Sequence, residues 1–340
     1  MRRSEGISTI TDVARHVGLG TATVSRVLNH QPRVSQRTRA RVLEAIEQLG
    51  YRPNEAARLL RGRTERLIGV IVPALSDYFL SQCAEGIQRA AQAEGYRVLV
   101  ACSENNLQTE RLEMRRMKER GASGVLVVPC DQSTQWVATS EMSNFPIVAL
   151  LRPLAGIRAD MVVMDQSECT MAAVRQLIGY GHRRIVCIGD DADTSIARER
   201  ELAFRQVVTA AGYLPRVIQC ATTRAAVHAA VAKAVQGESC DALFCLAWQS
   251  TMYVVRALQE VDTMESRKIA VAGFDDCGLV ELLYPQISTI SASTTALAHS
   301  GVRQLVKLIR RSHGPTEKGR RIVIPARLVC SPRADEAVGG

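Results

Sequence analysis

The chain has 340 residues, of which 46% are hydrophobic, an ordinary globular composition with room for two domains. No run of about eighteen apolar residues predicts a membrane span, and no apolar run near the N-terminus predicts a signal peptide, so we expect a cytoplasmic protein without a membrane partner. The ten cysteines occur singly, without a C-x-x-C pair, which favours small buried side chains in a reducing compartment over a metal site.

Positive charge is concentrated at the N-terminus. The formal net charge is +9, and residues 1–66 hold thirteen arginines and no lysine against six acidic residues. The rest of the chain is close to neutral. A compact basic segment beside a near-neutral body suits a polyanion such as double-stranded DNA. We therefore expect the DNA-contacting surface in the first fifth of the chain.

Three short helices are predicted within residues 9–50. Thr9 or Thr11 can cap a first helix that runs to Val17, and the glycine-containing turn 18–20 leads into a second helix over 21–28. Ser35 is placed to cap a third helix, and Gly50 to end it. This is the pattern of a helix-turn-helix module, which we place at residues 1–53. Residues 54–66 then predict one short helix and a linker, because Pro53 breaks the chain before them.

Beyond residue 66, short apolar runs alternate with helical stretches. This rhythm predicts buried parallel strands at 67–72, 98–101, 125–128, 147–151, 161–164, 185–188, 242–246 and 269–272, and a further strand at 321–330. About ten strands exceed a comfortable single sheet, so we expect an α/β body over 67–330 with two doubly wound, Rossmann-like lobes. The predicted lobes are 67–160 with 292–319 and 161–291 with 320–330, and residues 331–340 form a tail. A small-molecule ligand would bind between the lobes.

Six short segments follow one another at spacings that chance does not readily produce. They are Thr9-Ile10-Thr11-Asp12-Val13-Ala14, Thr23-Val24-Ser25-Arg26-Val27-Leu28-Asn29, Val34-Ser35, Thr38-Arg39, Leu49-Gly50-Tyr51-Arg52-Pro53-Asn54 and Ile68-Gly69-Val70. Together they resemble the LacI/GalR family of bacterial regulators, and the likeness covers nearly the whole chain. It implies a helix-turn-helix reader, a hinge helix, and an effector-sensing domain of two lobes that resembles periplasmic binding proteins.

The second helix of such a module lies in the major groove of DNA, so its early exposed residues face base edges. The resemblance implies base contacts by Thr21, Ala22 and Arg26, with Arg26 as a bidentate donor to guanine. A phosphate contact is the alternative role for Arg26. The family usually has Ser or Thr where this chain has Gly20, which removes a helix cap and a phosphate contact. The remaining phosphate contacts implied by the resemblance are Thr9, Thr23, Ser25, Asn29, Ser35 and Thr38.

Residues 54–62 resemble the family's hinge helix. In a dimer, two hinge helices would enter the minor groove together, where Ala57, Leu60 and Arg61 would meet the DNA and Leu60 would wedge into a central base step. A helix of about eight residues is below the marginal length in water, so we expect it to form only when DNA and a partner hinge support it. The alternative is a plain linker.

Two segments of the body resemble the family's effector-binding positions. Residues 195–204 resemble a helix start whose second arginine, here Arg200, binds effector, and residues 272–276 resemble a strand end whose first aspartate, here Asp275, binds effector hydroxyls. Doubly wound folds hold ligands at such places. A purely structural arginine–aspartate pair is the alternative. The complete predicted pocket is Arg152, Asp165, Ser195, Arg200, Trp248 and Asp275.

Two neighbouring positions depart from the family pattern. Ala247-Trp248 stands where the family often has Asn-Asp, and Leu150-Leu151-Arg152 stands where it has Ile-Asp-Arg. Two binders of sugar hydroxyls are therefore missing, whereas arginines and an aromatic surface are present. This favours a ligand with a carboxylate, phosphate or planar part, such as a sugar acid or sugar phosphate, over a neutral sugar. Trp248 as a core residue is the alternative.

Two other classes of protein share parts of this pattern. A periplasmic-type binding protein has the two-lobed body but needs a signal peptide and lacks a basic reader. A doubly wound enzyme needs catalytic groups, but no P-loop, H-E-x-x-H or nucleophile elbow is present and the six histidines do not cluster. We therefore expect a regulator that binds operator DNA and a small-molecule effector. We expect no enzymatic activity, metal or cofactor. The tail lacks a leucine heptad, which favours a homodimer on a palindromic operator over a tetramer.

Overall fold

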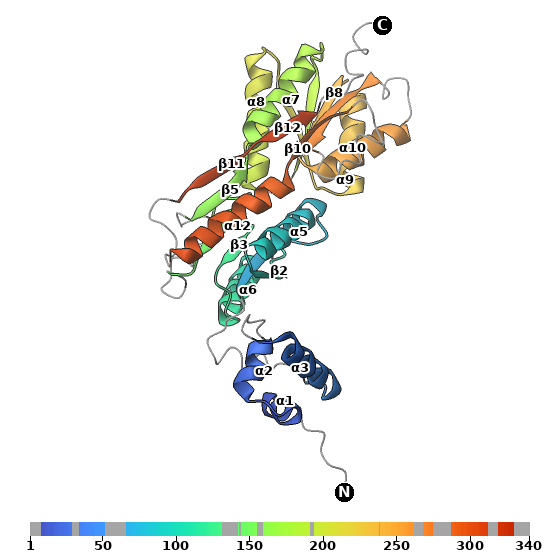
Figure 1. The fold of residues 1–340 in the computed structure, drawn as a ribbon. Helices are drawn as coiled ribbons and strands as arrows, with labels where there is room; N and C mark the ends of the chain where they lie inside the picture. The colour runs from blue at the N-terminus through green and yellow to red at the C-terminus, as the bar shows by residue number, and fades with distance from the viewer. Residues whose placement is uncertain are drawn as a thin grey trace. The chain divides into compact units, whose positions relative to one another are not determined.

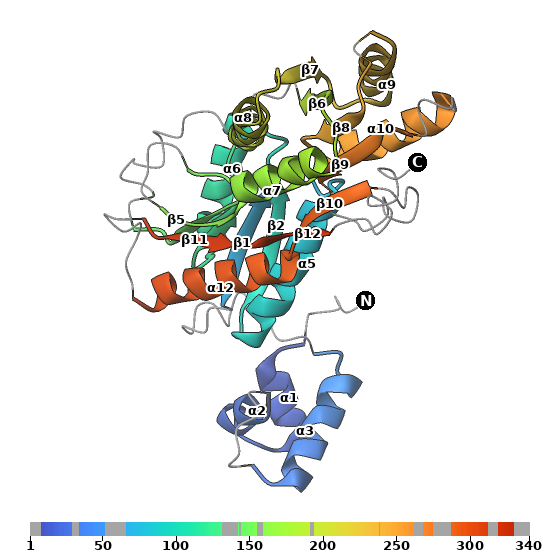
Figure 2. The same cartoon turned by 90° about the horizontal axis from the view of Figure 1, so that it is seen from above.

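A computed structural model of the chain describes residues 8–28, 34–51, 66–130, 142, 144–154, 159–190, 194–237, 239–261, 268–274, 287–311 and 319–329. Backbone contacts divide the chain into two compact units, Met1–Glu65 and Arg66–Gly340. The ribbon views show helices in the described part of the first unit, and strands flanked by helices in the second (Figures 1 and 2).

The first unit contains helices α1 (Ile10–Val17), α2 (Thr21–Leu28) and α3 (Gln36–Gln48). Thr9 caps α1 in a reciprocal capping box, in which its hydroxyl accepts a hydrogen bond from the Asp12 amide and the Asp12 carboxylate accepts one from the Thr9 amide. Ser35 caps α3. Gly50 follows α3 with φ of +58°, a backbone conformation that favours glycine at a helix end. The predicted helices and end signals are therefore confirmed.

The core of the first unit is small and apolar. Val13, Val24 and Val42, one from each helix, are completely buried. Ala14, Val17, Val27 and Ala45 complete the buried cluster. Because so few side chains hold the three helices together, each contributes a large share of the stability of this unit.

The first lobe is a six-stranded parallel sheet in the order β11-β5-β4-β3-β1-β2. The strands are β1 (Leu67–Val72), β2 (Arg97–Cys102), β3 (Val125–Val127), β4 (Ile147–Leu150), β5 (Asp160–Met164) and β11 (Arg321–Ile324). Helices α5 (Tyr78–Ala93) and α12 (Thr294–Arg310) pack side by side on one face, and α6 (Leu107–Glu119) covers the other (Figure 1). β11 lies beside β5 although some 150 residues separate them in the chain (Figure 1).

The sequence of β1 explains how both faces of this sheet are covered. Ile68, Val70 and Val72 alternate onto the face of α5 and α12, while Ile71 packs on the face of α6. Gly69 faces α6 at a very close approach: a Cβ there would lie 2.5 Å from the Val125 side chain and 2.9 Å from that of Met117. Only glycine fits this position without a shift of its neighbours.

The second lobe repeats this architecture in the order β12-β10-β9-β8-β6-β7. Its strands are β6 (Ile185–Asp190), β7 (Arg216–Cys220), β8 (Ala242–Cys245), β9 (Ala270–Phe274), β10 (Ile287–Ala292) and β12 (Ala326–Val329), of which only β12 runs antiparallel to its neighbour. Helices α7 (Gln166–Gly179) and α8 (Ser195–Ala210) cover one face. Helices α9 (Arg224–Ala232), continued by a π-helical turn over Lys233–Gly237, and α10 (Trp248–Val261) cover the other.

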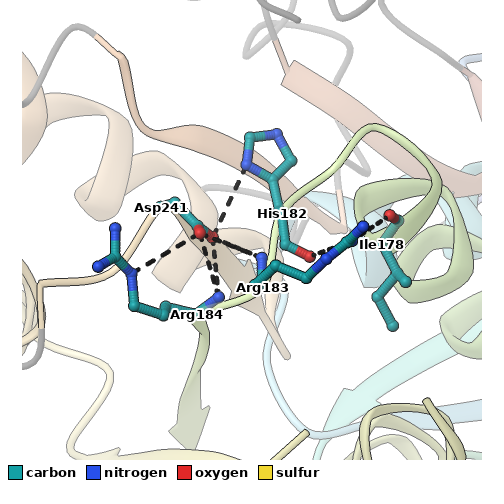
Figure 3. Close-up of polar contacts among 5 residues, drawn as sticks. All are labelled: Ile178, His182, Arg183, Arg184 and Asp241. Carbon is teal, nitrogen blue, oxygen red and sulfur yellow. Dashed lines mark hydrogen bonds and ion pairs between the residues drawn. The ribbon is translucent and has the colours of Figure 1, made fainter. Parts of the chain in front are cut away.

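A single carboxylate joins the starts of β6 and β8 (Figure 3). Asp241 accepts hydrogen bonds of 3.1–3.2 Å from the backbone amides of Arg183 and Arg184. The His182 ring lies 3.7 Å away, at its Nδ1 atom, and burial lowers the pKa of this histidine, with the Asp241 charge acting in the opposite direction. The Arg183 guanidinium turns away and donates to the Ile178 carbonyl oxygen, which ties the end of α7 to the same corner.

The structure differs from the predicted lobe boundaries at two places. β5 and β11 belong to the first sheet, whereas residues 161–164 and 320–324 were predicted in the second lobe. The predicted strand 321–330 is in fact two strands that leave one sheet and enter the other around Pro325, which cannot donate a ladder hydrogen bond. Strands β7 and β10, at the outer parts of the second sheet, were not predicted, because their polar residues weaken the apolar signal.

Cysteines are distributed through both lobes as packing residues. Cys83, Cys130, Cys169, Cys187, Cys240 and Cys245 are buried. Burial raises the pKa of the Cys130 and Cys245 thiols to about 12, so both are neutral at physiological pH. Within the described part of the chain, no helix is long and apolar enough to cross a membrane.

Candidate DNA-binding and ligand-binding sites

Helix α2 has one buried face and one exposed face. Val24 and Val27 point into the core, while Thr21, Ala22 and Arg26 are exposed. Ala22 and Arg26 are four residues apart and therefore lie on the same side of the helix. The three residues predicted to contact bases are thus left exposed by the described residues of the first unit.

The residues predicted to contact phosphates gather at helix N-termini. Thr9 and Ser35 are the N-caps of α1 and α3, and the Ser35 hydroxyl lies 2.8 Å from that of Thr38. Helix N-termini present backbone amides and a positive dipole end to anions. Thr23 and Ser25 are partly buried on α2. Asn29 and the predicted hinge residues Ala57, Leu60 and Arg61 lie outside the described residues.

A cavity of about 230 Å³ lies between the two lobes of the second unit. Its walls come from the segments that follow β1, β2, β3, β4 and β5 in the first lobe and β6 and β8 in the second. All of these segments leave the carboxyl ends of parallel strands, where doubly wound sheets bind ligands. Both sheets also change strand order beside their first strand, so the cavity lies where the topology of each lobe opens a crevice.

Arg152 enters this cavity from the end of β4. Leu151, immediately before it, has φ of +65°, and the Arg152 amide donates to the Leu150 carbonyl oxygen over 2.7 Å, so the chain makes a tight and unfavourable turn here. The guanidinium Nη1 donates to the Asn105 side-chain oxygen over 2.9 Å and to the Pro129 carbonyl oxygen over 3.3 Å. The turn and these two contacts hold a positive charge in the cavity wall.

A buried glutamate lies behind Arg152. Glu110 on α6 is fully buried and accepts a hydrogen bond of 2.6 Å from the Cys130 amide. Burial raises the pKa of this carboxyl group, while the Cys130 amide and the charge of Arg152 lower it. Glu110 does not line the cavity. It fastens the end of β3 to α6 and so supports the wall that carries Arg152.

Arg200 lines the same cavity from the first turns of α8. Its Nε donates to the Gln166 side-chain oxygen over 2.7 Å, its Nη1 donates to the Leu246 carbonyl oxygen, and its guanidinium stacks 3.4 Å above the centre of the Phe274 ring. Three elements of the second lobe therefore position this arginine. Both predicted arginines thus line one cavity.

Trp248 lines the cavity at the start of α10, also in the second lobe. Its ring packs partly on the core of the second lobe, and its Nε1 faces the Asp77 carboxylate of the first lobe at 3.5 Å. The Gln249 side-chain amide donates to the same carboxylate oxygen over 3.3 Å. Trp248 is therefore both a packing residue and a lining residue, so the two readings of the sequence do not exclude each other.

Two of the other predicted pocket residues, Ser195 and Asp165, do not line this cavity. Ser195 lines a second hollow of about 190 Å³ beside Glu199 and Arg321. Asp165 caps α7 by accepting a hydrogen bond from the Glu168 amide, and it lines neither hollow. Its short side chain is occupied by the helix start. Asp275 lies outside the described residues.

The cavity also contains polar residues that the sequence did not single out. They include Asp77, Asn105, Gln166 and Gln249, which all follow the carboxyl end of a strand. Gln166 comes two residues after β5, so a search for polar residues close to each strand end would have found it. Asp77, Asn105 and Gln249 come three to five residues after their strands, so only the folded chain brings them to the cavity.

A basic helix-turn-helix unit together with a two-lobed body that encloses a polar cavity defines the class of ligand-responsive transcription regulators. Comparison with protein families agrees with this class. The family described as bacterial regulatory proteins, lacI family, matches residues 9–54, and the periplasmic binding protein-like domain matches residues 174–330. The chain therefore combines a LacI-family helix-turn-helix domain with a periplasmic binding protein-like domain. It is a DNA-binding transcriptional repressor with a ligand-binding domain, and not an enzyme.

Characterised relatives align with almost the whole chain. Catabolite control protein A of Priestia megaterium is 27% identical over 308 residues, which cover 89% of this chain and 93% of the relative. The transcriptional repressor PurR of Aliivibrio fischeri is 27% identical and covers 89% and 92%. Among solved structures, the Lac repressor dimer bound to operator has a TM-score of 0.82 at 23% identity and covers 95% of this chain and 98% of that one. The regulator CelR in complex with cellobiose has a TM-score of 0.67 at 25% identity, with the same coverage.

Proposed function

We propose that the protein is a cytoplasmic homodimer that represses transcription at a palindromic operator and responds to a small anionic molecule bound between its lobes. Thr21, Ala22 and Arg26 read bases in the major groove. Thr9, Thr23, Ser25, Asn29, Ser35 and Thr38 contact phosphates, and the hinge residues Ala57, Leu60 and Arg61 enter the minor groove.

The exposed face of α2 supports the DNA-reading part of this proposal. Arg26 can form two parallel hydrogen bonds to a guanine, whereas Thr21 and Ala22 are small enough to let the helix approach the bases. The capped N-termini of α1 and α3 supply amides for the phosphates on either side. A twofold-symmetric dimer places two such readers on two half-sites, which requires a palindromic operator.

One observation carries the effector part of the proposal: two arginines, Arg152 and Arg200, line one interlobe cavity of about 230 Å³. A guanidinium matches the planar geometry of a carboxylate and binds phosphate equally well. The cavity volume suits a compact molecule of about the size of a monosaccharide. A sugar acid or a sugar phosphate fits both the charge and the size.

The experiment combines operator selection with ligand binding to the full chain. An operator is first selected from random double-stranded DNA, and its affinity is then measured by fluorescence anisotropy with and without aldonates, aldose phosphates and the matching neutral sugars. We expect anions, and not neutral sugars, to change operator affinity and to raise the melting temperature of the second unit. A response to neutral sugars alone would contradict the proposal.

Arg200→Met should abolish the response to ligand and preserve operator binding, since Arg200 belongs to the second unit. Arg198→Met is the matched control, because Arg198 is exposed on the same helix and does not line the cavity. If both variants respond like the wild-type protein, Arg200 does not bind the effector.

A further inference from the structure

The charges that line the interlobe cavity are not all of one sign. Arg152 and Arg200 are positive, but Asp77 brings a carboxylate into the same space. The Asp77 carboxylate would weaken the binding of a ligand that carries only negative groups, because like charges repel each other. Asp77 must therefore face a part of the ligand that is not anionic.

Asp77 is held in place by the helix that it caps. Its Oδ1 accepts a hydrogen bond of 3.1 Å from the Leu80 amide at the start of α5. Its Oδ2 points across to the second lobe, where Trp248 Nε1 and Gln249 Nε2 approach it at 3.5 and 3.3 Å. Both contacts are longer than the usual 2.9–3.0 Å of a good N–H···O hydrogen bond, so they are weak. A ligand hydroxyl would give this oxygen a shorter and stronger bond.

The donors that now face Asp77 are neutral, which indicates the chemistry that it accepts. An indole N–H and a side-chain amide can be replaced by hydroxyl groups without any change of charge. An anionic group at this place would lose the favourable contact and meet the carboxylate directly. The two neighbouring donors and the carboxylate together form a subsite for hydroxyl groups.

The hydroxyl subsite and the arginine come from different strands of the first sheet. Asp77 comes five residues after β1 and Arg152 two residues after β4, and β3 lies between these two strands. Both side chains line one cavity of about 230 Å³, which suits a molecule of about the size of a monosaccharide. A ligand of this size with an anion at one end and hydroxyl groups at the other can contact both side chains.

We propose that Asp77 is a specificity-determining residue that accepts hydrogen bonds from the hydroxyl end of a polyhydroxy monoanion, whose anionic group lies against Arg152. Asp77 thereby excludes molecules of the same length that carry a second negative charge. This inference rests on the proposed function, since it takes the interlobe cavity as the effector site. It states how the ligand is oriented in the cavity and that dianions of the same length are excluded.

The test uses pairs of sugar acids that differ only at one end. D-gluconate and D-galactonate end in a hydroxyl group, whereas D-glucarate and galactarate carry a second carboxylate in its place, and D-glucitol carries no carboxylate. Binding to the full wild-type chain is measured by thermal shift and calorimetry. We expect at least one monoanion to bind more than about tenfold more tightly than its paired dianion, because the second carboxylate meets Asp77 at close range.

Asp77→Asn removes the charge but keeps the cap, since asparagine is as good an N-cap as aspartate. This variant should melt at the wild-type temperature without ligand and should lose most of the discrimination between the paired acids. Glu104→Gln is the control: it removes the same charge from an exposed residue of the same lobe that does not line the cavity, and its discrimination should stay at the wild-type ratio.

Each other outcome contradicts a different statement. Equal binding of paired mono- and dianions by the wild-type chain, with loss of both in Arg152→Met, overturns the role of Asp77 and leaves the proposed anionic effector intact. Binding of D-glucitol as tight as that of D-gluconate overturns the anionic effector itself. If none of the monoanions binds, the polyhydroxy monoanion is the wrong class of ligand.

Discussion

The DNA-reading face and the ligand cavity of this protein are built in opposite ways. On α2, the three proposed base-reading residues lie within six consecutive positions of one helix, and caps a few residues away define the neighbouring helix ends. The ligand cavity draws its walls from seven chain segments spread over residues 77–249. A DNA-reading surface made from one helix depends on residues close together in the sequence. A cavity made from strand ends exists only when two whole sheets have formed.

This contrast predicts that the two functions fail separately, and the largest effect should follow from a charge in the core of the reader. Val24→Asp places a carboxylate among six other buried side chains, which should cost more than about 4 kcal/mol and unfold the first unit. Operator binding should disappear while the ligand-induced thermal shift of the second unit remains. Val24→Ile is the control with an apolar side chain. Loss of the ligand response in Val24→Asp would show that the two units do not fold independently.

The cavity should instead be sensitive to packing far from its lining. Gly69→Val introduces atoms where a Cβ already lies 2.5 Å from the Val125 side chain, so it should destabilise the second unit by about 3 kcal/mol, at the upper end of overpacking costs. Gly179→Val is the matched control, because a Cβ there meets nothing within 4 Å. Chemical unfolding measures both variants. Equal stability of the two variants would mean that the sheet and α6 adjust freely at this position.

A smaller effect, confined to DNA, is expected for the reader's exposed arginine. Arg26→Ala should weaken operator binding by about 1–3 kcal/mol and relax base preference at one symmetric pair of operator positions, with no change in ligand affinity. Arg15→Ala is a suitable control, because Arg15 is also exposed, lies on α1 and pairs with Asp12. Binding is measured on operators substituted at each position. A uniform loss on all sequences would make Arg26 a phosphate contact.

The smallest effect concerns pH and only the second unit. Because burial lowers the pKa of His182, the folded protein binds this proton more weakly than the unfolded chain does. The contribution of His182 to the free energy of unfolding is therefore fully present above the ordinary histidine pKa of 6.5. It declines as the pH falls through that value towards the lower pKa of the folded state. His182→Gln should reduce the loss of stability between pH 7.5 and 5.5. His182→Asn is a second variant that removes the imidazole, and it should reduce the loss of stability in the same way.

The helices of the first unit and most strands of the second could be predicted because their signals are local. Thr9 and Ser35 as caps, Gly50 as a helix end and apolar runs such as 67–72 act over a few residues. The division into lobes could not be predicted to the strand, because β5 and β11 pair across the chain. Around Pro325, β11 and β12 follow each other in the sequence but belong to different sheets. No short sequence signal marks the point where the chain passes from one sheet to the other.

The ligand site shows the same limit residue by residue. Arg152, Arg200 and Trp248 were predicted as pocket residues and line the cavity, whereas Ser195 and Asp165 were predicted with them and lie elsewhere. The position along the sequence places a side chain near a strand end, but the turn that precedes it decides where the side chain points. At Leu151, a positive φ directs Arg152 inward, and at Asp165 a helix cap uses the carboxylate.

The sequence by itself therefore determined the class of the protein, the helical reader with its basic charge, and the α/β body behind it, because helix caps, hydrophobic periodicity and charge act between neighbours in the chain. The tertiary structure alone decided which strands share a sheet and brought Asp77 opposite the arginines. The physical reason is that strand pairing and cavity walls depend on contacts between residues far apart in sequence, whose register no short segment encodes.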